Sequence, residues 1–141
     1  MVEGLDVGVG YYTQDGKTTV DTGTYGQDEG TVYIKYSTGP VSLGYQKGAV
    51  TNYTGGAEET QFVNNYYGIS YKVSDALSIS YNEMDSRKSV GGTDVEQDFD
   101  SISLSYTVGG MTVGIARVEE TNIDFGSTSD ENTILSVAIA F

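Results

Sequence analysis

Residues 101–108 read SISLSYTV, with a large apolar residue at every second position. Successive side chains of a strand point to opposite faces, so this pattern predicts a β-strand with one apolar and one polar face. Gly109-Gly110 follows, a pair typical of tight turns, and the alternation resumes in residues 111–116. Together the two stretches are predicted to form an antiparallel hairpin.

The same alternation recurs along the whole chain. The 141 residues fit one domain, 1–141, and the 19 glycines together with frequent Val, Ile, Tyr, Thr and Ser favour strands over helices. Eight strands are predicted, over residues 5–12, 31–37, 41–46, 66–73, 77–82, 101–108, 111–116 and 134–141.

The predicted connections alternate between short and long. Tight turns are predicted near residues 37–40, 74–75 and 109–110, whereas the long polar connections cover residues 13–30, 48–61, 83–100 and 119–131. These long stretches hold 17 of the 20 acidic residues, so the predicted strands are nearly free of carboxylates. Neither strand face is therefore an ordinary protein surface, and the alternation of loop length is typical of outer-membrane barrels.

Aromatic residues on the apolar side form two predicted belts. One belt lies near the long connections and the other near the short turns, with Val, Ile and Leu between them, as expected where rings settle at membrane interfaces. The belts comprise Tyr11, Tyr45, Tyr67 and Tyr81, and Tyr36, Tyr71, Tyr106 and Phe141. The predicted fold is all-β, an antiparallel up-and-down transmembrane β-barrel with about eight strands in this chain.

Composition excludes several classes of function. Histidine and cysteine are absent, which removes the commonest general base, the commonest zinc ligands and disulfides. A net charge of −13 argues against nucleic-acid binding. No secretory signal is visible at the start, and no apolar run is long enough for a transmembrane helix. We therefore expect neither an enzyme nor a metal or cofactor site.

Three stretches resemble the final strands of bacterial general porins, particularly those of alphaproteobacteria: residues 66–86, 101–120 and 133–141 (TILSVAIAF). The resemblance implies a bacterial outer-membrane protein that lets small hydrophilic solutes and ions diffuse passively. It also implies contact with outer-membrane lipid, a homo-oligomer, by family resemblance a trimer, and recognition by the barrel-assembly machinery. The assembly signal implied by the family comprises Leu135, Val137, Ile139 and Phe141.

Porins of this family usually have sixteen strands and a constriction loop inside the lumen. Here about eight strands are predicted and no stretch stands out as such a loop, so the chain resembles the C-terminal half of a porin or a shortened version. Eight strands alone close around an interior that side chains fill.

Five residues on the polar parity are predicted to line a pore. Lys35 and Lys72 are candidates for a basic strip that attracts anionic solutes, and the alternative is that they merely satisfy inward carboxylates or water. Tyr12, Tyr33 and Tyr66 are candidates for narrowing a passage.

Arg117 falls on the apolar parity at the long-connection end of its strand, where a long side chain can extend to the interface. The acidic runs at residues 95–100 and 127–132 offer carboxylates to Ca²⁺ or Mg²⁺, but they lack fixed ligand spacing and are interpreted as solvated loops.

One alternative remains open at the level of sequence. A soluble all-β binding or adhesion module shows the same strand pattern with its apolar side turned inward. An enzyme is third, since no carboxylate pair has a spacing that singles it out.

Overall fold

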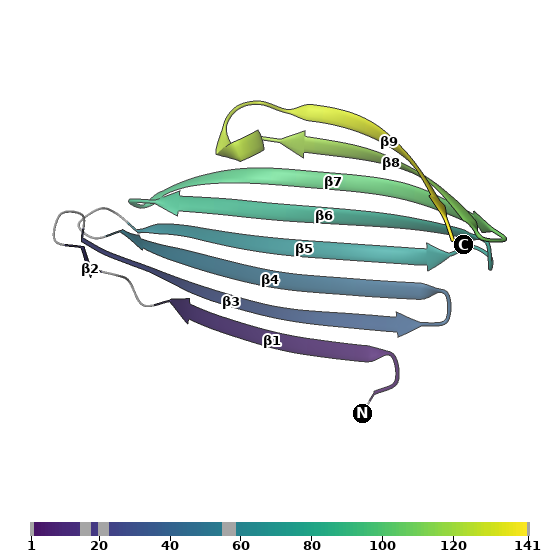
Figure 1. Cartoon of the computed structure of the whole chain (residues 1–141), viewed down its shortest axis with the longest axis horizontal. Coiled ribbons are helices and arrows are strands. Elements are labelled where there is room, and N and C mark those ends of the chain that lie inside the picture. The colour runs from purple at the N-terminus through teal and green to yellow at the C-terminus, as the bar shows by residue number, and fades with distance from the viewer. Residues whose placement is uncertain (1, 15–17, 20–22, 55–58, 141) are drawn as a thin grey trace.

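The computed structural model describes residues 2–14, 18–19, 23–54 and 59–140. These residues form one antiparallel sheet in which each long strand pairs with its neighbours in the chain (Figure 1). The sheet contains β1 (Leu5–Gln14), β3 (Gly23–Thr38), β4 (Val41–Thr54), β5 (Thr60–Lys72), β6 (Leu77–Val90), β7 (Thr93–Val108), β8 (Met111–Thr121) and β9 (Asp130–Ile139). The two-residue β2 (Thr18–Thr19) pairs with β3, and η1 (Ile123–Phe125) is a 3₁₀ turn. The predicted all-β, antiparallel, up-and-down class is confirmed.

The sheet is open in the part of the chain that the structure describes. The path of paired strands starts at β1 and finishes at β9, and no pairing joins these two across the described residues. Both strands therefore present one row of unpaired backbone N–H and C=O groups, which can pair with a further strand.

The three predicted tight turns are confirmed. Gly39 (φ 53°) joins β3 to β4 and Gly109 (φ 59°) joins β7 to β8, and glycine adopts these left-handed angles without strain. Between β5 and β6, the Ser74 hydroxyl accepts hydrogen bonds from the Ala76 and Leu77 amides at 3.2 and 3.1 Å.

The prediction of four long connections is wrong for most of their length. The strands continue into the polar stretches: β4 extends to residue 54, and β6 and β7 are joined by Gly91-Gly92 alone. Both glycines have positive φ, which suits a two-residue hairpin turn. Strands of 10–16 residues result, where only six to eight had been predicted from alternation.

The sheet has almost no buried core. Of the described residues, only Val118 and Ser86 are classed as buried, at 8% and 7% exposure. Among the residues that the structure describes, no second sheet covers either face. No helix among the described residues is long and apolar enough to cross a membrane.

Candidate functional site: the apolar band and the polar face

One face of the sheet carries a continuous belt of exposed large apolar side chains, here called the apolar band. Strand register places these residues opposite one another across every long strand, as in the run Ile79, Leu104 and Ile115. The band comprises Val7, Val9, Tyr11, Val32, Ile34, Tyr36, Leu43, Tyr67, Ile69, Tyr71, Val73, Ile79, Tyr81, Ile102, Leu104, Tyr106, Val108, Met111, Ile115, Leu135, Val137 and Ile139. All are exposed in this chain.

The band crosses the strands obliquely. Its upper edge is the last large apolar residue of each strand before the strand turns polar. On β4 this is the half-buried Tyr45, and on the other strands it is one of the exposed residues Tyr11, Val32, Tyr67, Tyr81, Ile102, Ile115 and Leu135. The paired positions, followed from strand to strand, lead from Leu135 on β9 to Thr38 on β3. Extending the register between β3 and β1 places residue 3 opposite Thr38, whereas the upper edge of the band on β1 is residue 11. The edge therefore descends by 8 residues across seven strand pairs.

This slope gives the inclination of the strands to the band. A shift of about 1.1 residues per strand, at roughly 3.3 Å per residue and roughly 4.8 Å between strands, corresponds to an angle of about 38°. Membrane barrels tilt their strands by about 35–45°. The angle between the strands and the band lies within this range.

The tyrosines nearer the short turns follow the same slope. Tyr36, Tyr71 and Tyr106 lie on β3, β5 and β7, and each is two residues lower in register than the one before. That is about one residue per strand, so the two rows of rings run parallel. Phe141, predicted to belong to the lower belt and to the assembly signal, lies outside the described residues.

Tyrosine hydroxyls at the upper edge point away from the band. The Tyr11 hydroxyl donates to Asp28 at 3.5 Å, and the Tyr45 hydroxyl donates to Asn65 at 3.1 Å. Tyr81 donates to Glu83 and Asp100, which lie one row farther up their strands. Each ring thus belongs to the apolar band while its hydroxyl meets polar groups, the arrangement expected of tyrosine at an interface.

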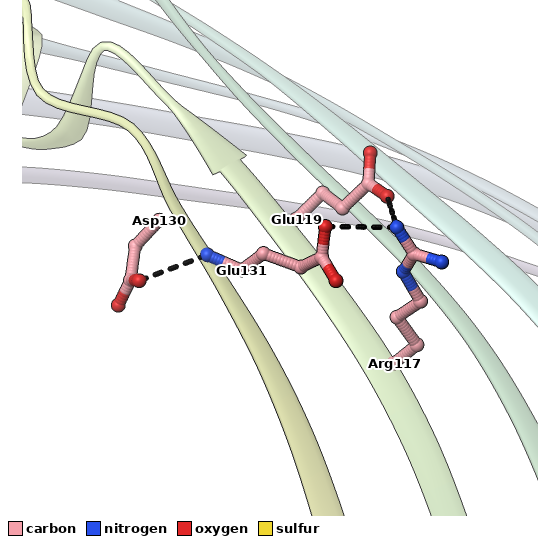
Figure 2. A network of polar contacts seen from close by, with 4 residues as sticks. All are labelled: Arg117, Glu119, Asp130 and Glu131. Atoms are coloured by element: carbon pink, nitrogen blue, oxygen red, sulfur yellow. Dashed lines mark hydrogen bonds and ion pairs between the residues drawn. The ribbon is translucent and has the colours of Figure 1, made fainter.

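Acidic side chains occupy the same face above the band. Glu83, Asp100, Glu119 and Glu131 lie opposite one another on four successive strands. Like charges in such positions repel each other. Arg117, at the upper edge of the band, reaches up and binds Glu119 at 2.9 Å and Glu131 at 2.8 Å (Figure 2).

A second acidic position above the band lies on β3. The pKa of the Asp28 carboxyl is lowered by hydrogen bonds from Thr13, from Tyr53 and from Tyr11, since all three stabilise the ionised form. The Tyr53 hydroxyl donates to Asp28 at 2.9 Å, and this bond raises the pKa of Tyr53. Hydrogen bonds between carboxylates and phenols thus link neighbouring strands in the polar part of the sheet above the band.

The five residues predicted to line a pore share the face opposite the band, here called the polar face: Tyr12, Tyr33, Lys35, Tyr66 and Lys72. Tyr33 lies along the sheet instead of projecting from it. Its ring contacts Gly8, where an added Cβ would lie 2.2 Å from the ring, and its hydroxyl donates to Asp6 at 3.3 Å.

The remaining four residues lie at different heights of the polar face. Lys35 is opposite Asp6 in register, and Lys72 is 3.8 Å from Asp75 near the short turns. Tyr12 and Tyr66 border an open hollow of about 410 Å³. The structure therefore does not gather the two lysines and three tyrosines into a single constriction.

Between these residues the polar face is small and hydroxylated. Ser80 pairs with Ser103 at 2.7 Å, and Thr107 with Thr112 at 2.9 Å, each across neighbouring strands. No cluster of three acidic side chains suited to a metal ion is present among the described residues.

Sequence reasoning missed the acidic rows because charged residues were assigned to loops. A signal was present in β6. From residue 79 to 87 every second residue lies on the face of the band, and this two-residue period continues through Glu83, Asp85 and Arg87 without interruption. No protein-family model matches this chain, and no curated protein matches it in sequence.

Proposed function

We propose that the chain forms the wall of an outer-membrane pore of the porin type, through which small hydrophilic solutes and ions diffuse passively. The observation that carries the proposal is the apolar band: exposed, edged by tyrosines, and inclined to the strands at about 38°. Lipid hydrocarbon is its proposed neighbour, and the polar face lines the passage.

The exposed band is too large to remain in water. It contains 22 large apolar side chains, which are between 37% and 85% exposed and about half exposed on average. At about 1 kcal/mol for half of one such side chain, covering the band is worth on the order of 20 kcal/mol. Soluble monomers rarely leave a contiguous apolar patch of this size in water, so the size of the band supports an assembly that covers this face.

Lipid accounts for the edges of the band, whereas a second protein layer does not. A soluble binding module would pack the band against another sheet and would bury its tyrosines at no particular level. Here tyrosines at the upper edge point their hydroxyls at the acidic extension, and Arg117 turns its charge away from the apolar residues. Both features fit a boundary between hydrocarbon and water.

In the proposed assembly the unpaired edges of β1 and β9 pair with each other or with further strands. Closure into a barrel removes both edges, which lipid cannot satisfy. A homo-oligomer, an outer-membrane location and recognition by the assembly machinery are part of the same proposal.

The test uses the absence of native cysteine. Single cysteines are introduced at Leu104 in the band and at its neighbour Ser103 on the polar face, and the protein is reconstituted in vesicles and planar bilayers. We expect a membrane-confined reagent to label position 104, a water-soluble reagent to label position 103, and the unmodified protein to conduct ions. Stable solubility without detergent, or the reverse labelling, would exclude the proposal in favour of the soluble module.

A further inference from the structure

The connection between β8 and β9 places an aromatic side chain over the polar face. It carries η1, which lies at the end of the sheet opposite the two termini (Figure 1) and packs against β7. From there Phe125 reaches Phe62 on β5, three strands from β8, with ring centroids 5.6 Å apart. Phe62 is on the polar face, so the Phe125 side chain lies over the polar face at this end of the sheet.

Lys88 is held between these two rings. Its Nζ lies 5.9 Å from the Phe62 centroid and 5.8 Å from that of Phe125, both within cation–π range. Phe62 and Lys88 are opposite each other on β5 and β6, whereas Phe125 comes from a segment distant in the chain. The three side chains form what we call the Lys88 clamp.

The backbone of the connection is bent to deliver Phe125. Asn122, Asp124 and Phe125 have φ of 53°, 55° and 59°, a left-handed conformation that costs free energy for residues with a Cβ. The bend is closed by the Ile123 amide, which donates to the Thr128 carbonyl at 2.9 Å. Such strain persists only where the surrounding structure favours it, and the contacts of Phe125 with Phe62 and Lys88 act in this direction.

Among the described residues, no carboxylate forms an ion pair with Lys88. Within the described residues, the ion pairs of the sheet involve Lys72, Arg87 and Arg117. Aromatic rings orient an ammonium group but carry no net charge, so the clamp fixes a cation on the polar face.

We propose that the β8–β9 connection is a strap that narrows the passage, and that the Lys88 clamp makes this narrowing selective for anions. The inference rests on the proposed pore and assigns it a specificity-determining residue. Small anions would be drawn to the ammonium group at the narrowed site, and cations repelled from it.

The first experiment compares two adjacent residues on opposite faces of β6. Lys88→Gln removes the clamped cation, and Arg87→Gln, on the band face and paired with Asp94, is the matched control. Reversal potentials across a salt gradient give the ratio of cation to anion permeability. We expect this ratio to rise for Lys88→Gln and to stay at the wild-type value for Arg87→Gln. Equal ratios in wild type and Lys88→Gln would overturn the role of Lys88.

The second experiment releases the strap. Phe125→Ala is expected to raise single-channel conductance and to increase the reaction of Lys88 with an amine-specific reagent, measured by mass spectrometry. Phe62→Ala should reproduce both effects, and Ser127→Ala, an exposed position of the same connection, should reproduce neither. Heat-modifiable gel migration checks that every variant is folded.

The two readouts separate the possible failures. If the wild-type protein conducts and Phe125→Ala leaves its conductance unchanged, the strap does not narrow the passage. If Lys88 reacts equally in wild type and Phe125→Ala, the clamp itself is refuted. If the folded wild-type protein inserts into bilayers but carries no current, the pore proposal fails, and the selectivity of the strap fails with it.

Discussion

Replacing Leu104 by arginine tests what covers the apolar band. Leu104 lies on β7, between Ile79 and Ile115 in register and inside both edges of the band. On the lipid face of a barrel, arginine at this depth costs about 2–4 kcal/mol, falling to about 0–1 kcal/mol near the interface. A cost of about 2–4 kcal/mol lowers the folding equilibrium constant by a factor of roughly 30 to 800.

The matched control is Gln61→Arg. Gln61 is exposed on the same face of the sheet, on β5 above the band. It should change the free energy of unfolding by less than about 0.5 kcal/mol, as surface substitutions generally do. Urea unfolding in lipid vesicles, followed by tyrosine fluorescence and by gel migration, measures both variants.

Comparison of the destabilisation by Leu104→Arg and by Gln61→Arg shows whether water or hydrocarbon covers the apolar band. If Leu104→Arg and Gln61→Arg destabilise the protein equally, the band faces water and the pore proposal is refuted. If Leu104→Arg destabilises the protein just as strongly in buffer without lipid or detergent, a protein layer covers the band instead.

Three further predictions concern single contacts. Tyr81→Phe removes a hydroxyl that bonds two carboxylates and should lower the free energy of unfolding in urea by about 0.5–1.5 kcal/mol. Tyr106→Phe, in the lower row of tyrosines, should lower it by less. Equal losses would contradict the interfacial role of the upper row. Gly8→Ala places a Cβ against a tyrosine ring and should cost about 1–3 kcal/mol, while Gly44→Ala meets no atom within 4 Å and should be nearly neutral, as thermal unfolding will show. The pKa of Asp28 is lowered on folding, so its contribution to stability is present above its ordinary pKa of 3.8 and is lost as the pH falls below that value. Asp28→Asn should therefore flatten this part of the profile of thermal stability against pH. An unchanged profile would refute the contribution of Asp28.

Alternation in the sequence was sufficient to find all eight long strands and the side of each that is apolar. It failed at the strand ends, because β6 and β7 carry charge on the band parity and charged stretches are usually connections. Glu83 and Asp100 are in fact ladder partners. From the sequence, Gly91-Gly92 is interpreted as a turn inside a long loop, whereas in the structure it is the whole connection between β6 and β7, with both glycines at positive φ.

The parts of the candidate site that depend on register lay beyond sequence reasoning. The slope of the band emerges only when each strand is aligned with its neighbours, because a shift of a few residues in one pair would change it. The Lys88 clamp joins residues 62, 88 and 125, and no local pattern predicts a contact between positions so far apart. The alternation placed Tyr33 on the polar face, but it did not predict that its ring would lie against Gly8.

Because every long strand pairs only with the strands before and after it, the chain is a series of equivalent hairpins. Inserting or deleting one whole hairpin would leave every other register, and the parity of every other strand, unchanged. Insertion of a single strand would instead reverse the direction of all that follow. The meander therefore allows duplication of a gene segment to change the width of the sheet in steps of two strands, while the remainder of the sheet continues to fold by contacts between close neighbours in the chain.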